Sequence, residues 1–116
     1  MTQVTIFHHP RCSKSRETLA LLESKGVEIQ IVEYLKQVPD AATLSELLAK
    51  LGISARELMR TKEEEYKAQG LNNPELTEAQ LIAAMIATPK LIERPIVLAN
   101  GKAAIGRPPE NVLAIL

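Results

Sequence analysis

The stretch "VTIFHHPRCSKSRETLALLESKGVEIQI" (4–31) moves from a strand pattern to a helix pattern and back. Residues 4–7 are β-favouring and predict a strand inside the sheet. From Ser15 the apolar spacing becomes helical, and Gly26 provides a stop. Residues 27–31 then alternate between apolar and polar, as in a second strand. Strand, helix and strand predict a βαβ unit with parallel strands and a right-handed crossover.

The middle of the chain has the caps and apolar spacing of helices. Asp40 precedes "AATLSELLAKLG" as a cap, and "SARE" (54–57) and "TEAQ" (77–80) fit capping boxes. These signals predict a helical insertion over about residues 40–88.

A hairpin and a last helix are predicted for the end of the chain. "RPIVLANGKAAIG" (94–106) places Asn100-Gly101 between two β-rich runs, which predicts a type I′ turn. "RPPENVLAIL" (107–116) then begins a helix near its prolines. The βαβ half and this ββα half should share one small mixed sheet of four strands. The expected fold is therefore α/β and thioredoxin-like, with residues 1–116 forming a single domain that carries the helical insertion.

Composition excludes several classes of function. Fourteen basic residues balance fourteen acidic ones, and aromatic residues make up 3% of the chain. Without net charge or aromatic platforms, neither nucleic acid nor a membrane surface is an expected partner. The chain has no apolar signal core and no apolar run of about 20 residues, so a cytoplasmic protein is expected. A monomer is expected too, because no large exposed apolar stripe is evident.

A single cysteine, Cys12, limits the redox chemistry. It excludes an internal disulfide, a Cys-x-x-Cys pair and a multi-cysteine zinc site. His8 and His9 stand close by, but they lack carboxylate support, and no metal is expected. If Cys12 takes part in redox chemistry, the second thiol must come from another molecule.

The position of Cys12 favours an ionised sulfur. It follows the carboxyl end of a predicted strand and precedes a helix, and the N-terminus of a helix offers free N–H groups and about half a positive charge. A cysteine placed there has a lowered pKa and becomes a nucleophile. His8 can donate a hydrogen bond to the sulfur, and the local cations and hydroxyls are Arg11, Lys14, Arg16, Ser13 and Ser15. A small buried apolar cysteine is the open alternative.

Three distant arginines are candidate anion ligands. Arg94 and Arg107 each precede a proline, which holds their backbone extended. In a thioredoxin-like fold the proline that opens the third strand, here Pro95, lies beside the cysteine and is usually cis, so Arg94 should face the sulfur. Arg60 ends the "ARELMR" helix and could fold over the same site. Because a guanidinium donates two parallel bonds to two oxygens, a thiolate among these groups predicts a small oxyanion as the guest.

Four motifs together resemble the glutaredoxin-coupled arsenate reductase family over nearly the whole chain: "HHPRCSKSRETL", "ARELMR", "ERPIV" and "IGRPPENVL". The resemblance implies that Cys12 attacks arsenate, or a similar small oxyanion, to form a thioarsenate adduct. It also implies that glutathione attacks this adduct as co-substrate and that glutaredoxin removes the glutathione to release arsenite, with no bound cofactor. By the same resemblance, His8 tunes the activity and the Ser15 hydroxyl contacts the thiolate. The family's oxyanion ligands would be Arg60, Arg94 and Arg107. Arg16 is a further candidate oxyanion ligand because of its place in the cysteine loop.

Three other functions stay open. A low-molecular-weight phosphatase would need Cys-x5-Arg, whereas Arg16 gives Cys-x3-Arg. A non-enzymatic adaptor of this fold that binds RNA polymerase commonly carries Cys-x-x-Cys, and Ser15 stands where the second cysteine would be. A glutathione-linked thiol transferase would use the arginines to hold the carboxylates of glutathione.

Overall fold

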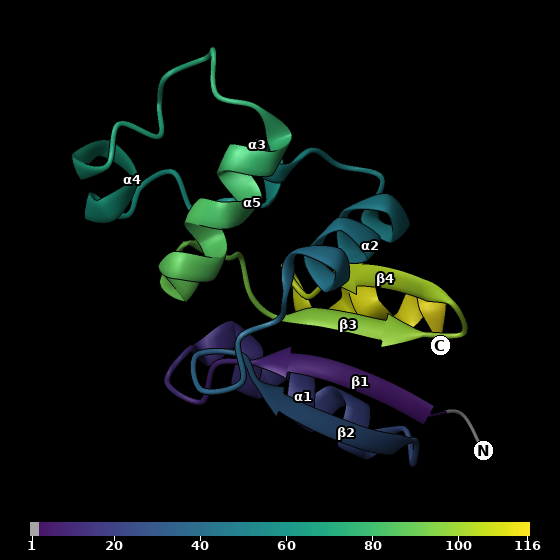
Figure 1. Cartoon of the computed structure of the whole chain (residues 1–116). Coiled ribbons are helices and arrows are strands. Elements are labelled where there is room, and N and C mark those ends of the chain that lie inside the picture. The colour runs from purple at the N-terminus through teal and green to yellow at the C-terminus, as the bar shows by residue number, and fades with distance from the viewer. Residues whose placement is uncertain (1–2) are drawn as a thin grey trace. The chain divides into compact units, whose positions relative to one another are not determined.

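The computed structural model describes residues 3–116, which divide into two compact units (Figure 1). The sheet unit contains the chain up to Gln37 together with Arg94–Leu116, and the helical unit contains Val38–Glu93. The helical insertion predicted over about 40–88 falls within the range of the helical unit. The assignment of the whole chain to one domain stays a prediction.

The sheet unit is built on a mixed sheet in the order β2-β1-β3-β4. Its strands are β1 (Gln3–His8), β2 (Glu28–Glu33), β3 (Ile96–Ala99) and β4 (Lys102–Ile105). β1 runs parallel to β2 and antiparallel to β3, and β3 is antiparallel to β4. Both the βαβ unit and the interior position of β1 are thereby confirmed, as is the thioredoxin-like α/β fold.

One face of the sheet carries the core of this unit. Helix α1 (Ser13–Ser24) lies behind β1 and β2 in Figure 1, and the 3-10 helix η2 (Pro109–Ile115) also packs against α1 and the sheet. The buried cluster consists of apolar side chains from both helices and from β1 and β3: Val4, Ile6, Leu22, Val97, Ala99, Val112 and Ile115. Burial of these aliphatic groups, at about 25 cal/mol per Å² of apolar surface, is the main force that fixes α1 on the sheet.

The hairpin and the closing helix follow from local sequence. Asn100 and Gly101 have φ values of 54° and 74°, which is the positive pair that a type I′ turn requires. The closing helix is present, but it is a 3-10 helix. Its buried side chains, Val112 and Ile115, are three residues apart, and this is the spacing at which 3-10 side chains point the same way.

The helical unit packs α5 (Glu78–Ala87) against α2 (Ala41–Leu51), α3 (Ala55–Leu58) and the short 3-10 helix η1 (Pro89–Leu91). A further helix, α4 (Glu64–Ala68), lies between α3 and α5 in the sequence. The caps are those that the sequence predicts: Asp40 accepts from the Thr43 N–H, and both capping boxes form. Gly52 ends α2 in the left-handed conformation, at φ 69°.

The capping box of α5 allows a test of whether the helix caps stabilise the fold. Thr77 accepts from the Gln80 N–H at 3.2 Å, while its own N–H donates to the Gln80 Oε1 at 2.8 Å. Thr77→Ala should therefore lower the free energy of unfolding by about 1 kcal/mol, measured by urea denaturation. Ser45→Ala is the control, because it removes an exposed hydroxyl from the middle of α2. Equal stability of the two variants would contradict the capping role.

Within residues 3–116, none of the helices combines the length and the apolar character that crossing a bilayer requires.

Candidate functional site: the thiol at the start of helix α1

Cys12 occupies the N-cap position of α1. β1 ends at His8, and the chain turns so that the Cys12 N–H donates to the His9 carbonyl at 3.0 Å. Cys12 itself is extended, with φ −91° and ψ 123°, and its carbonyl accepts the first helical bond from Arg16 at 3.0 Å. Its sulfur is therefore held at the positive end of a twelve-residue helix, half-buried.

Two arginines from the C-terminal part of the sheet unit converge on this sulfur. An Nη atom of Arg107 donates to the Cys12 Sγ at 3.4 Å, and its Nε donates to the Arg94 carbonyl at 2.8 Å. The side chain of Arg94 also hydrogen-bonds the Cys12 sulfur. The structure thus brings Arg94 and Arg107 to the cysteine, although they lie more than 80 residues away along the chain.

Opposing effects set the pKa of Cys12, and the net result is a lowered value. Burial alone would raise the pKa. Hydrogen bonds to the sulfur from the Ser15 backbone, the Arg94 side chain and the Lys14 backbone lower it, and so does the charge of Arg107. These donors favour the thiolate over the thiol. The alternative of an apolar buried cysteine does not fit a half-exposed sulfur with two guanidinium partners.

His8 and Ser15 are both buried and form a pair beneath the loop. His8 Nδ1 and the Ser15 hydroxyl are 2.7 Å apart, and the same hydroxyl accepts from the His9 N–H at 3.0 Å. Burial lowers the pKa of His8, against the charge of Glu33, which raises it. The sequence predicts that His8 and the Ser15 hydroxyl contact the Cys12 sulfur. The Ser15 hydroxyl instead joins His8 to the loop, and it is the Ser15 backbone that hydrogen-bonds the sulfur.

Loss of the Ser15 hydroxyl should destabilise the fold. Ser15→Ala leaves the buried His8 nitrogen and the His9 N–H without this partner, which should cost about 1–3 kcal/mol in the free energy of unfolding. Ser13→Ala removes an exposed hydroxyl two residues away and is the matched control. Urea unfolding of both variants is the measurement, and a Ser15→Ala variant as stable as Ser13→Ala would refute the bridging role.

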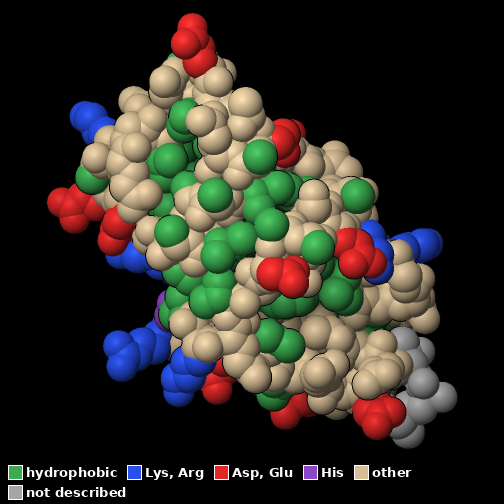
Figure 2. Space-filling model, viewed as in Figure 1, with side chains coloured by type: hydrophobic (Ala, Val, Ile, Leu, Met, Phe, Trp, Pro, Cys, Tyr) green, Lys and Arg blue, Asp and Glu red, His purple; other side chains and the backbone are tan. Residues whose placement is uncertain are grey.

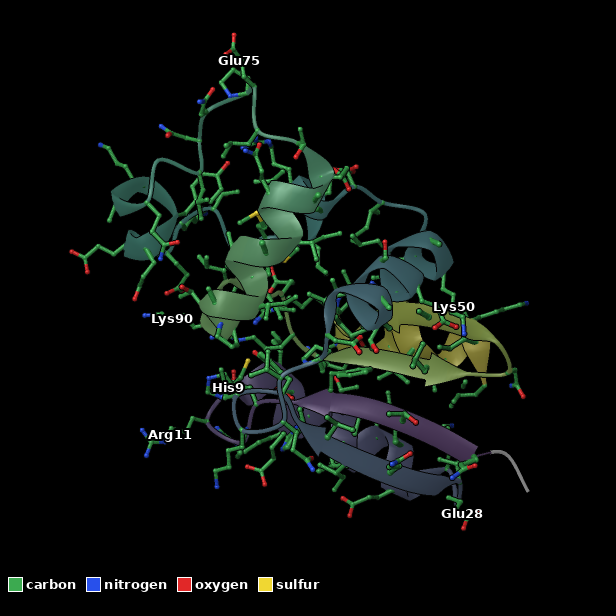
Figure 3. All side chains as sticks on the ribbon, in the orientation of Figure 1. His9, Arg11, Glu28, Lys50, Glu75 and Lys90 are labelled. Atoms are coloured by element: carbon green, nitrogen blue, oxygen red, sulfur yellow. The ribbon has the colours of Figure 1, made fainter. Side chains whose placement is uncertain are left out.

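The other cations of the loop are directed elsewhere. Arg16 is exposed and donates to the Pro10 carbonyl at 3.1 Å, while Lys14 lies 3.5 Å from the Glu17 carboxylate. Arg11 is exposed and points away from the fold in Figure 3. Figure 2 shows Lys and Arg side chains, in blue, close to a histidine side chain, in purple, at one edge of the molecule. They contribute local positive charge, whereas Arg94 and Arg107 make the direct contacts with the sulfur.

Residues 7–115 match the model of the ArsC family. This chain belongs to the ArsC family. It is 62% identical over 115 residues to the Escherichia coli K12 protein YfgD, described as uncharacterized, covering 98% of this chain and 97% of that one. It is 52% identical over 117 residues to an arsenate reductase of Neisseria meningitidis, covering all of both chains. The solved structure of an arsenate reductase from Vibrio cholerae superposes with a TM-score of 0.97 at 52% identity, covering 99% of this chain and 98% of that one.

The third predicted arginine of this ArsC-family chain, Arg60, belongs to the helical unit. Its Nη1 lies 2.7 Å from Glu93 and its Nε 3.2 Å from Glu63. Burial would lower the pKa of Arg60, but the two carboxylates outweigh it and raise the pKa. Within its own unit Arg60 is thus ion-paired on both sides, and its role at the cysteine stays a prediction.

The described part of this ArsC-family chain, residues 3–116, contains no group of three or more His, Cys, Asp or Glu side chains arranged to hold a metal ion.

Sequence reasoning missed two features around the arginines. The Arg94–Pro95 peptide bond is cis, as expected for the proline that opens the third strand, but the Arg107–Pro108 bond is cis as well. Gly106, next to Arg107, is buried against Thr18 of α1. Pro108 and Gly106 carry no charge and no reactive group. Only the three-dimensional structure therefore shows that they lie beside the arginines.

Proposed function

We propose that this protein reduces arsenate to arsenite, with glutathione and glutaredoxin as electron donors. The observation that carries the proposal is the Cys12 sulfur, which is hydrogen-bonded by Arg94 and lies 3.4 Å from a nitrogen of Arg107. A thiolate supplies the nucleophile, and the guanidinium forks suit the oxygens of a tetrahedral anion. Membership of the ArsC family and the named arsenate reductases among its relatives support arsenate as that anion.

The proposed reaction begins with attack of the Cys12 thiolate on arsenic. An S–As bond forms, and one arsenate oxygen takes up protons and leaves as water. Arg94 and Arg107 stabilise the charge on the remaining oxygens and hold the anion beside the sulfur. By the family resemblance, Arg60 adds to this positive charge and His8 tunes the activity. Arg16 supplies a further positive charge from the cysteine loop.

The electrons come from two thiols outside this chain, because Cys12 is its only cysteine. The glutathione thiol displaces a second oxygen as water and forms a second S–As bond. A glutaredoxin thiolate then attacks the glutathione sulfur, and the electron pair of that S–As bond stays on arsenic. Arsenic is thereby reduced from As(V) to As(III), while the two thiols become a mixed disulfide. Hydrolysis of the remaining bond to Cys12 releases arsenite and regenerates the thiol.

A coupled assay tests the proposal. Purified protein, glutathione, glutaredoxin, glutathione reductase and NADPH are combined, and the loss of NADPH absorbance is followed with and without arsenate. We expect oxidation that requires arsenate and every protein component. Turnover of a glutathione mixed disulfide without any response to arsenate would overturn the proposal in favour of a thiol transferase. Hydrolysis of a phosphate ester without glutathione would overturn it in favour of a phosphatase.

A further inference from the structure

Gly106 is buried where the end of β4 approaches helix α1. A Cβ atom added at Gly106 would lie 2.5 Å from the Thr18 Oγ1 and 2.8 Å from the Pro95 Cγ. Atoms at such distances overlap, so the backbone at this point comes nearer to Thr18 than any residue with a side chain allows. The Gly106 N–H donates to the Pro95 carbonyl at 3.0 Å, which ties the same backbone to the start of β3.

Thr18 is the partner on the helix side, and it is fully buried. Its hydroxyl donates to the Lys14 carbonyl at 2.8 Å and lies 3.5 Å from the Gly106 carbonyl. Its methyl group lies 3.1 Å from the position that a Cβ at Gly106 would take. Thr18 therefore fills the space between α1 and the Gly106 backbone with one polar and one apolar contact.

We propose that Thr18 and Gly106 form a spacer that sets the distance between Arg107 and the Cys12 sulfur. α1 carries Cys12 at its N-cap and Thr18 on its buried face, and a helix is a stiff element. Arg107 follows Gly106 directly and reaches back to the sulfur, at 3.4 Å, and to the Arg94 carbonyl, at 2.8 Å. Any change in the Thr18–Gly106 contact thus moves the origin of the Arg107 side chain relative to the thiol.

The spacer deepens the proposed function, since it rests on Cys12 and Arg107 as the reacting pair. Thr18 and Gly106 touch neither substrate nor sulfur in this scheme, so they are positioning residues. A displacement of about 1 Å would take a 3.4 Å contact beyond hydrogen-bonding distance to sulfur, because such bonds weaken steeply with distance and angle. The charged groups that face Cys12 are Arg94 and Arg107, and only Arg107 is attached next to the spacer.

The pKa of the Cys12 thiol gives a direct test, because the chain has one cysteine and alkylation reports that cysteine alone. Thr18→Val keeps the shape of the side chain but replaces the hydroxyl with a methyl group. The methyl group cannot bond the Lys14 carbonyl, and it replaces the polar contact with the Gly106 carbonyl by an apolar one. We expect the thiol pKa to rise by about half a unit to one unit, part of the effect of an adjacent charge. Thr18→Ser keeps the hydroxyl and should retain a thiol pKa close to wild type.

Leu22→Ala is the control for general destabilisation. Leu22 lies one turn further along α1, is fully buried, and belongs to the core cluster. The Leu22→Ala substitution should lower the melting temperature while leaving the pKa of the Cys12 thiol unchanged. If Thr18→Val lowers the melting temperature in the same way without any shift of the thiol pKa, the residue is only structural and the spacer is refuted.

Gly106→Ala provides the second variant. It should raise the thiol pKa as Thr18→Val does, since the added Cβ forces the backbone away from α1. If Gly106→Ala does not fold, the comparison of Thr18→Val with Thr18→Ser decides the proposal alone. The thiol pKa is measured without arsenate, so a spacer that fails leaves the arsenate assay unaffected. An arsenate assay that fails likewise leaves the pKa comparison intact.

Discussion

Replacement of Cys12 by serine abolishes arsenate reduction on this account, with a loss of about three orders of magnitude or more. Serine has no sulfur, and its hydroxyl stays protonated at neutral pH, so the S–As bond cannot form. The hydrogen-bond donors around position 12 remain in place, and the variant should still bind the oxyanion. The coupled NADPH assay measures the loss of arsenate reduction. A titration of the variant with arsenate measures whether it still binds the oxyanion.

Ser13→Ala is the matched control for this substitution, since it changes an exposed hydroxyl beside Cys12. It should keep the activity within a factor of a few. Full arsenate reduction by Cys12→Ser would rule out the thiolate mechanism. A Cys12→Ser variant that still bound RNA polymerase, in a protein whose wild type showed no arsenate turnover, would favour the adaptor function.

Replacement of Arg107 by alanine should affect both the nucleophile and the oxyanion. The variant loses a positive charge 3.4 Å from the sulfur, so the thiol pKa should rise by about one unit or more. It also loses a donor to the anion, which typically costs about two to three orders of magnitude in kcat. Arg107→Lys should fall between wild type and alanine, because the ammonium keeps the charge but lacks the planar fork with which Arg107 bonds the sulfur and the Arg94 carbonyl. Alkylation rates across pH and the coupled assay give the two readouts.

Arg11→Ala is the comparison for charge alone. Arg11 lies next to Cys12 in the sequence but is exposed and turned outward (Figure 3). Its removal should change the thiol pKa by a few tenths of a unit at most, because exposed charges are screened. Equal effects of Arg11→Ala and Arg107→Ala would show that general positive charge, and not the contact with Arg107, tunes the thiol.

The fold was predictable where the signals are local. The cap at Asp40, the capping boxes and the Asn100-Gly101 turn each depend on a few consecutive residues, and each forms as expected. β2 illustrates the limit: its alternation predicts an apolar face, yet Ile31 is 48% exposed. β2 is an edge strand, and strand order depends on pairings that alternation alone does not encode.

The reactive and charged residues of the candidate site could be predicted from the sequence. The contacts that hold them in place could not. Cys12 stands out as the only thiol, and Arg94 could be assigned to it through the proline that follows it in a thioredoxin-like fold. The pairing of the Ser15 hydroxyl with His8 is different, since it depends on the turn between β1 and α1. The contact between Thr18 and Gly106 joins residues 88 positions apart without any reactive group to mark it. Such contacts are set by packing, which a single sequence does not reveal.

The thiol pKa of Cys12 in the wild-type protein tests the central claim, that its surroundings favour the thiolate and hold the pKa below that of an ordinary cysteine. The rate of iodoacetamide alkylation is measured from acidic to alkaline pH, and the only cysteine of the chain gives a single titration. Alkylation should accelerate as pH rises through the lowered pKa and reach a plateau above it, with the midpoint below the value of about 8.5 for a free cysteine. A midpoint at or above that ordinary value would contradict an activated thiolate held by Arg94, Arg107 and the start of α1.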